Sequence, residues 1–160
     1  MAVDLEVGDI APAFELLGSN GKVHRLLDYE GRVVVLAWFP KAFTGGWTTE
    51  CKSLRESSDQ LQEFDVAYFM VSVDDHETNT KFAQSLDADF PFLSDPEKFA
   101  AIAYGVVDDE RAVPLRWTFI IGPNGKILSI DKNVRPETSG EDLAANLSSL
   151  GVVKKWLAWD

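Results

Sequence analysis

The amino-acid sequence predicts an α/β fold with a mixed central sheet, and three patterns point to it. Two apolar runs, 33–39 and 66–73, have the length of buried strands rather than of helices. Segments with apolar residues at helical spacing separate and follow these runs, so strands and helices alternate along the first half of the chain. Later, a Gly-Pro-Asn-Gly turn at 122–125 joins two further apolar runs, as in an antiparallel pair. Parallel crossovers and an antiparallel pair together predict a mixed sheet with helices on both faces.

The first elements follow from turn residues and uninterrupted apolar runs. The turn Gly18-Ser19-Asn20-Gly21 lies between the segments 14–16 and 23–25, and this predicts an N-terminal hairpin. The run 33–39 has no polar residue, as expected of a parallel central strand that is buried on both faces. Pro40 ends this strand, because proline lacks the N–H that sheet pairing needs.

Helices are expected where apolar residues recur every three or four positions or where a capping residue precedes them. Over 47–64, such spacing places Trp47 and Cys51 on one helix face. Asp75 is the expected N-cap of a helix over 76–86. The remaining expected elements, in order, are an extended segment at 90–93, a helix at 97–104 introduced by Asp95-Pro96, strands at 116–121 and 127–130, and a helix that Ser139 caps and Gly151 ends. This order is typical of a thioredoxin-like arrangement.

Composition and charge narrow the classes of function. The chain has 160 residues, of which 46% are hydrophobic and 26% charged, so we expect one globular domain over residues 1–160. No apolar run approaches the roughly 20 residues of a membrane-spanning helix. Fifteen Lys and Arg against 26 Asp and Glu give a net charge of −11. This charge repels phosphate backbones and acidic lipids, so neither nucleic acid nor a membrane is an expected partner.

Cysteine and histidine content bears on cofactors and compartment. Cys51 is the single cysteine, so an internal disulfide cannot form, and His24 and His76 lie far apart among polar residues. This pattern predicts neither a zinc or iron site nor another cofactor. The start of the sequence lacks the basic and then apolar stretch of a signal peptide. Together with the missing disulfide, this predicts a cytoplasmic location.

The loop 40–46 has the features of a binding site. It joins the carboxyl end of a central strand to a helix N-terminus, which is where ligands bind in open α/β sheets. Gly45 and Gly46 allow backbone N–H groups to approach a ligand closely, and the helix N-terminus favours anions. Arg116, at the start of a later strand, can reach the same end of the sheet. The helix N-terminus and Arg116 would both lower the pKa of a thiol placed at position 47.

Within this loop, three residues separate Pro40 from Thr44, and two separate Thr44 from Trp47. This spacing resembles the signature of the AhpC/TSA-type peroxiredoxins, and within them the bacterioferritin-comigratory (PrxQ) branch. In that family a peroxide-attacking Cys stands where this chain has Trp47. Further matches, in the family's order, lie at 7–14, 72–74, 90–96, 104–106, 116–121 and 124–127. The resemblance covers nearly the whole chain and implies a thioredoxin-like fold and peroxide reduction.

The resemblance also implies roles for individual residues. Pro40 would shield the site, Thr44 would hydrogen-bond the peroxide and Arg116 would polarise it. Glu50 matches a residue that orients the Arg, so a Glu50–Arg116 contact beside Trp47 is expected. The implied substrates are hydrogen peroxide or an organic hydroperoxide, and the implied reductant is thioredoxin-like or glutathione-type. The implied state is a monomer or homodimer, with an antioxidant role in cell redox homeostasis.

Three positions depart from the family's pattern. Trp47 carries no nucleophile. The residues that would bind the peroxide are therefore expected without the atom that would attack it. Four origins of Trp47 stay open: a natural loss of the site, a deliberate substitution, a replaced selenocysteine, or an ordinary core tryptophan. Selenocysteine is encoded by UGA, one base from the Trp codon UGG. Cys51 lies four residues after position 47, whereas the branch often has its resolving thiol one residue later, so Cys51 is either a core residue or a resolving thiol. Gly45 stands where proline is frequent, which loosens the loop.

Two functions follow from these departures. The first is a thiol- or selenol-dependent peroxide reductase whose reacting residue is replaced in this chain. The second is a redox-silent peroxiredoxin-like protein that binds an anion or a protein partner. The codon at position 47 of the source gene separates them, because UGA or a Cys codon favours the enzyme and a genomic UGG favours the binding protein.

Overall fold

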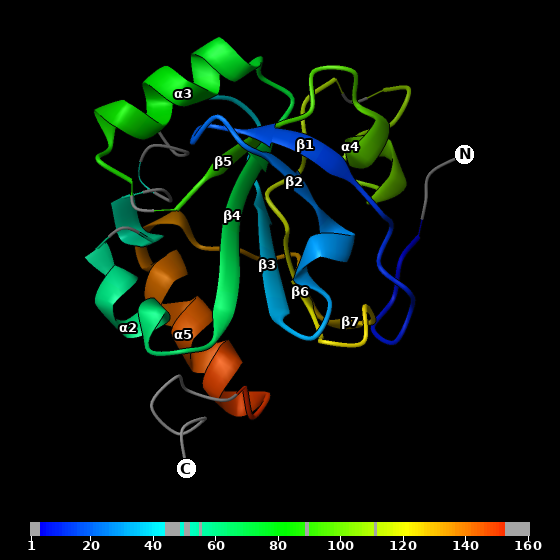
Figure 1. Ribbon diagram of the computed structural model, residues 1–160, viewed down its shortest axis with the longest axis vertical. Helices are drawn as coiled ribbons and strands as arrows, with labels where there is room; N and C mark the ends of the chain where they lie inside the picture. The colour runs from blue at the N-terminus through cyan, green and yellow to red at the C-terminus, as the bar shows by residue number, and fades with distance from the viewer. Residues whose placement is uncertain are drawn as a thin grey trace.

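A seven-stranded sheet forms the centre of the molecule. The computed structural model describes residues 4–43, 49, 52–54, 56–88, 90–110 and 112–152. The strands are β1 (Glu15–Gly18), β2 (Val23–Arg25), β3 (Val33–Trp38), β4 (Val66–Ser72), β5 (Phe92–Ser94), β6 (Thr118–Ile121) and β7 (Ile127–Asp131). They are arranged in the order β2-β1-β5-β4-β3-β6-β7 (Figure 1). The predicted mixed sheet is confirmed, because β4 runs parallel to β3 and β5 while β6 runs antiparallel to β3.

Helices cover both faces of this sheet, as predicted. They are α2 (Ser58–Gln62), α3 (His76–Ser85), α4 (Phe99–Ala103) and α5 (Ser139–Ser149), with short 3-10 turns η1 (Leu26–Tyr29) and η2 (Pro136–Thr138). Helices α2, α3 and α5 lie on one face of the sheet, and α4 and η1 lie on the other (Figure 1). Their apolar side chains pack into the buried cluster of that face.

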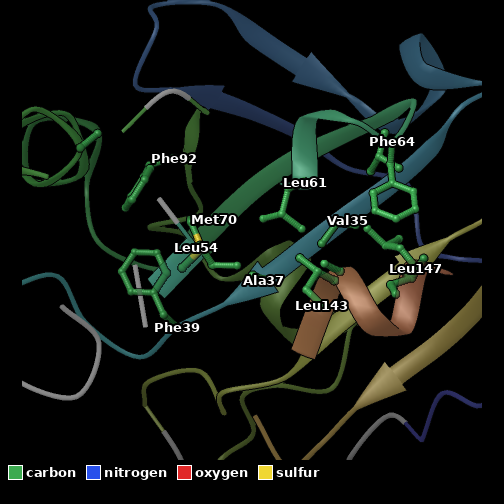
Figure 2. Packing of buried hydrophobic residues seen from close by; sticks show 14 of the residues in the cluster. Val35, Ala37, Phe39, Leu54, Leu61, Phe64, Met70, Phe92, Leu143 and Leu147 are labelled. Carbon is green, nitrogen blue, oxygen red and sulfur yellow. The ribbon is translucent and has the colours of Figure 1, made fainter. Parts of the chain in front are cut away.

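Strand β3 alternates its side chains between the two faces and is buried throughout. Val35 and Ala37 belong to the buried cluster that α2, α3 and α5 cover, which we call the α5 face. Leu36 and Trp38 belong to the cluster that α4 and η1 cover, which we call the α4 face. Figure 2 shows Leu143 of α5 close to Val35 and Ala37. Both faces need apolar side chains, and this explains the uninterrupted apolar run.

The register of the central strands brings three chain segments to one edge of the sheet. Strands β3 and β4 pair in parallel from Val33 with Val66 to Trp38 with Val71, so their carboxyl ends lie side by side. Strand β6 begins at the same edge, because it pairs with β3 in the opposite direction. We call the ends of β3 and β4 and the start of β6 the carboxyl edge.

The N-terminal hairpin is present, and it extends the main sheet. Strands β1 and β2 pair antiparallel, with Leu16 opposite His24. Strand β1 also pairs antiparallel with β5, where Leu17 lies opposite Ser94. The turn residues predict the hairpin, but they carry no information about this second, long-range pairing.

The predictions for the ends of α3 and α5 are largely confirmed. Asp75 caps α3, since its Oδ1 accepts a hydrogen bond from Thr78 N at 2.8 Å. Gly151 follows α5 with a φ of 73°, and its N–H donates to Ser148 O. The prediction that Ser139 caps α5 is wrong by one residue. The turn η2 runs directly into the helix, so Ser139 already has helical backbone angles.

The predicted helix start at Asp95-Pro96 is wrong. Helix α4 begins at Phe99, after Lys98 with a left-handed φ of 67°. The buried Asp95 carboxylate reaches forward and accepts a hydrogen bond from Ala101 N at 2.7 Å. This contact ties the segment before α4 into a turn, and a first helical turn does not form there.

Candidate active site

Pro40 and Arg116 lie together at the carboxyl edge. Strand β3 ends at Trp38, whose N–H donates to Trp117 O at 2.9 Å, and Phe39 continues the pairing with β4. Pro40 directly follows Phe39, and Arg116 directly precedes Trp117. Both residues are half-buried. The two predicted site residues that the structure describes therefore lie just beyond the ends of adjacent strands, at the same edge of the sheet.

A carboxylate holds the segment that leads from Pro40 into the candidate loop. The N–H of the buried Ala42 donates to Asp74 Oδ2 at 2.8 Å. The next residue, Phe43, has a left-handed φ of 63°, and its ring centre lies 4.9 Å from that of Phe82 on α3. A phenylalanine disfavours this backbone conformation, so the neighbouring contacts must hold it.

Below this segment lies a network of buried polar side chains. Ser72 Oγ donates to Asp74 Oδ2 at 2.9 Å and accepts from Asn79 Nδ2 at 2.9 Å. Asn79 Nδ2 also reaches Ser94 Oγ at 3.0 Å. Ser72 and Asn79 are fully buried, and Ser94 is nearly so. The network links β4, α3 and β5, and we call it the Asp74 network.

The chain after the candidate loop packs against α5. Residues 52–54 and 56 are helical, and a turn at Ser57 precedes α2. Gly140 N donates to Ser53 Oγ at 3.1 Å. A Cβ at Gly140 would lie 2.5 Å from Ser53 O and from Ser57 Oγ, so only glycine permits this approach. Ser53 and Ser57 are thus packed closely against the start of α5.

A lysine also lies beside the edge. Lys132 Nζ lies 4.5 Å from the ring centre of Trp117, the residue next to Arg116. A cation over an indole face is attracted by the ring's electron density. Asp131 lies opposite Thr118 between β7 and β6, so charges of both signs stand at this edge.

An apolar cavity of about 240 Å³ lies on the α5 face, between the sheet and α2. Its lining includes Val35, Ala37, Leu54 and Leu143. Tyr68 also lines it, and the Tyr68 hydroxyl donates to Leu61 O at 2.6 Å. Burial raises the pKa of Tyr68 far above its usual value, so this hydroxyl stays neutral. The cavity lies beneath the helical segment that follows the candidate loop.

Four predicted site residues, Thr44, Trp47, Glu50 and Cys51, lie outside the described residues. The expected Glu50–Arg116 contact and the position of the indole therefore stay predictions. The structure does place Arg116 at the edge where the loop begins, and not at the opposite end of the sheet.

The model of the AhpC/TSA family matches residues 7–130 of this chain. The chain belongs to the AhpC/TSA family. Among its relatives are two proteins named peroxiredoxin Bcp. The one from Bacillus subtilis is 33% identical over 137 residues, covering 82% of this chain and 87% of that protein. The one from Escherichia coli is 32% identical over 129 residues, covering 77% of this chain and 83% of that protein.

Solved structures confirm the predicted thioredoxin-like fold. The crystal structure of peroxidoxin BcpB from Mycobacterium tuberculosis aligns with a TM-score of 0.82 and 26% identity, covering 91% of this chain and 98% of that one. A mutant of Xylella fastidiosa PrxQ aligns with a TM-score of 0.84 and 23% identity, covering 93% and 99%. With the relatives above, this places the AhpC/TSA-family chain in the Bcp/PrxQ branch of the peroxiredoxins.

The sequence patterns assign no role to Asp74 or Asn79, which lie behind the start of the candidate loop in the structure. Ser72-Val73-Asp74 matches the family, but the resemblance implies no role for it. The usable signal is a polar pair directly after a buried strand, because this position lies at the carboxyl edge. Asn79 has no such signal, since an Asn on a helix is usually exposed.

In the described part of the chain, no group of three or more His, Cys, Asp and Glu side chains is placed to hold a metal ion. In the same residues, no helix is both long and apolar enough to cross a membrane.

Proposed function

We propose that this AhpC/TSA-family chain is a peroxiredoxin-like peroxide reductase whose reacting residue is replaced by Trp47. The observation that carries the proposal is the meeting of Pro40 and Arg116 at the carboxyl edge, where the loop toward position 47 begins. The relatives named peroxiredoxin Bcp support peroxide as the substrate. The reductant is a thioredoxin-like or glutathione-type thiol, and the reaction needs no bound cofactor.

The proposed chemistry needs a thiolate or selenolate at position 47. The anion attacks one peroxide oxygen, so a sulfur–oxygen bond forms while the oxygen–oxygen bond breaks. The other oxygen takes up a proton and leaves as water or alcohol, and the thiol is oxidised to a sulfenic acid. Two thiols of the reductant then reduce the sulfenic acid to the thiol, release water and are themselves oxidised to a disulfide. Pro40 shields the site, Thr44 hydrogen-bonds the peroxide, and Arg116, oriented by Glu50, stabilises the developing negative charge.

Trp47 cannot perform this attack, because the indole nitrogen lone pair belongs to the aromatic system. The chain as written is therefore inactive or nearly so with hydrogen peroxide. The codon that encodes position 47 decides whether a selenocysteine or cysteine has been replaced. Cys51 is a core or resolving thiol. Because the chain with Trp47 has no peroxidase activity, Cys51→Ser should not change its activity.

A second candidate function is a redox-silent protein that binds an anion or a protein partner. The observation that favours it is the missing nucleophile at position 47, in a loop that begins at the same edge of the sheet as Arg116. This candidate expects a genomic UGG codon and anion binding that depends on Arg116.

The deciding experiment is the substitution Trp47→Cys, with Trp47→Ser as the matched control. We expect Trp47→Cys to reduce hydrogen peroxide with thioredoxin as donor, while Trp47→Ser and the unsubstituted chain do not. The helix N-terminus and Arg116 should hold the pKa of the introduced thiol between roughly 3.5 and 7.5. A folded Trp47→Cys protein with a thiol pKa above about 8 and no turnover would reject the enzyme and favour the binding protein.

We further propose that residues 1–160 form one domain, that the protein acts as a monomer or homodimer, and that it is cytoplasmic. The single sheet that spans the described residues supports the first point. Size-exclusion chromatography with light scattering tests the second, and cell fractionation tests the third.

A further inference from the structure

The geometry points to Asp74 as a positioning residue for the candidate site. Its carboxylate fixes the peptide N–H of Ala42 and thereby the chain that leads from Pro40 toward position 47. This inference rests on the proposed function for the identity of the site. It adds a residue at the end of β4 to the loop that follows β3.

The hydrogen bonds converge on a single carboxylate oxygen. Asp74 Oδ2 accepts from Ala42 N at 2.8 Å and from Ser72 Oγ at 2.9 Å. Asp74 N in turn donates to Ser72 Oγ at 3.2 Å. Bonds to a charged acceptor are stronger and more directional than bonds between neutral groups. Ser72 therefore orients the carboxylate, and the carboxylate orients the Ala42 peptide.

Burial gives this arrangement its rigidity. Ser72 and Asn79 are fully buried, and Asn79 Nδ2 bridges Ser72 Oγ at 2.9 Å to Ser94 Oγ at 3.0 Å. Another rotamer of Ser72 or Asn79 would leave a buried polar atom without a hydrogen bond. Three elements, β4, α3 and β5, thus combine to hold Asp74 in one orientation.

The loop side of the contact needs this support. Phe43 follows Ala42 with a left-handed φ of 63°, and its side chain is 56% exposed. A phenylalanine leaves this conformation readily unless its neighbours hold the backbone. The Ala42–Asp74 bond holds one side of Phe43, and the ring contact with Phe82 holds the other.

The neighbouring Asp75 has a different task and provides a matched control. Asp75 Oδ1 accepts from Thr78 N at 2.8 Å and caps α3. The two adjacent aspartates therefore divide their functions, since Asp74 contacts the loop and Asp75 contacts the helix. If only the loss of a negative charge at this point of the chain mattered, Asp74→Ala and Asp75→Ala would have the same effect on the loop.

The first test measures amide hydrogen exchange by NMR in the unsubstituted chain, Asp74→Ala, Asp74→Asn and Asp75→Ala. We expect exchange at Ala42 N–H to rise about tenfold or more in Asp74→Ala, relative to core amides such as Leu36. Asp74→Asn keeps an acceptor oxygen, so its Ala42 exchange rate should lie between those of the unsubstituted chain and Asp74→Ala. Asp75→Ala should change the first turn of α3 and leave Ala42 as it is. Equal Ala42 exchange in Asp74→Ala and the unsubstituted chain would overturn the inference.

The second test uses the Trp47→Cys/Cys51→Ser chain, which has a single thiol. The pH dependence of its alkylation by iodoacetamide gives the thiol pKa without any peroxide. We expect Asp74→Ala to raise this pKa by about one pH unit, and Asp75→Ala to leave it unchanged, because a loosened loop aligns its N–H groups poorly with the thiolate. Where peroxide is reduced, the rate should fall about tenfold in Asp74→Ala only.

These outcomes separate the two proposals. If the single-thiol chain does not react with peroxide but Asp74→Ala still shifts its thiol pKa and Ala42 exchange, the proposed function fails and the positioning role stands. If peroxide is reduced and Asp74→Ala changes neither the thiol pKa nor the rate, the positioning role fails and the proposed function stands.

Discussion

The two faces of the sheet are packed differently. On the α4 face, the ring centre of Tyr104 lies 6.0 Å from Trp38 and 5.1 Å from Phe119. The Tyr104 hydroxyl also donates to Pro12 O at 2.7 Å, which ties the N-terminal segment down. On the α5 face, a cavity of about 240 Å³ separates part of the sheet from α2.

The cavity of the α5 face lies beside helical residues that follow the candidate loop in the sequence. The helical segment after position 47 and α2 rest on the α5 face, where Leu54 and Leu61 line the cavity. Side chains beside a void can shift at lower cost than those in close packing, because fewer contacts are lost. The sheet is thus packed closely around Tyr104 on the α4 face, whereas the α5 face leaves a cavity beside Leu54 and α2.

A pair of leucine truncations gives the largest test of this comparison. Leu93 is fully buried on the α4 face, and Leu54 is buried on the α5 face beside the cavity. We expect Leu93→Ala to lower the free energy of unfolding by about 4 kcal/mol and Leu54→Ala by about 2 kcal/mol. Urea denaturation measures both. Equal losses would show that the cavity does not loosen the packing around Leu54.

Gly140→Ala tests the one close approach described on the α5 face. The new Cβ would lie 2.5 Å from Ser53 O and Ser57 Oγ, so Ser53 and Ser57 must move away from α5. We expect a loss of about 2–3 kcal/mol in unfolding free energy. Ser148→Ala, on the exposed side of α5, is the control and should change stability by less than about 0.5 kcal/mol. A stabilised Gly140→Ala chain would mean that the 52–57 segment is not fixed there.

Enlarging one alanine on each face of the sheet tests how much free volume each face has. Ala37 lines the cavity on the α5 face, and Ala67 is buried on the α4 face. We expect Ala67→Val to cost about 1–2 kcal/mol by overpacking, whereas Ala37→Val should stay within about 0.5 kcal/mol because the cavity accepts the methyl groups. Thermal unfolding of both variants provides the ranking, and the reverse order would contradict the comparison.

The smallest expected effect concerns pH and the α4 face. His24 is buried there, with Nδ1 2.6 Å from the Tyr29 hydroxyl and its ring against Phe69. Burial lowers the pKa of His24 below its usual 6.5. The unfolded chain therefore binds the proton first as the pH falls below about 6.5, and the free energy of unfolding decreases by at most about 1.4 kcal/mol per pH unit. Above that pH, His24 is neutral in both states and adds no slope.

Urea titrations at a series of pH values below neutrality measure this slope. His24→Gln should remove the part of the slope that His24 causes, while the two chains should run parallel between about pH 7 and 8. An unchanged slope in His24→Gln would assign the acid sensitivity to other groups.

Local patterns predicted most elements, whereas long-range contacts lay beyond them. The apolar runs predicted β3 and β4 because both faces of a central strand need apolar side chains. Asp75 predicted the start of α3 because capping involves residues only three apart. The start of α4 was missed because Asp95 contacts Ala101 through its side chain, and no spacing rule describes that bond.

The candidate site shows the same division. Strand and helix signals predict a site loop at 40–46, and the family resemblance implies the role of Arg116; the structure describes residues 40–43 and Arg116 at one edge of the sheet. The bond between Ala42 and Asp74 joins residues that are far apart in the sequence, and only the parallel register of β3 and β4 brings them together. Neither residue type signals that bond, because an alanine contributes only its backbone.

The long-range pairing of the sheet has a consequence for biosynthesis. Leu17 pairs with Ser94, and Val34 of the central strand pairs with Ile121. At about 5–20 residues per second, the ribosome needs several seconds to add the partners after the first strands have emerged. During that interval, β1 can pair with β2 and β3 with β4, so one edge of each strand still exposes unpaired backbone groups. The strand order that brings the candidate site together thus also sets how long these two edges wait for their partners.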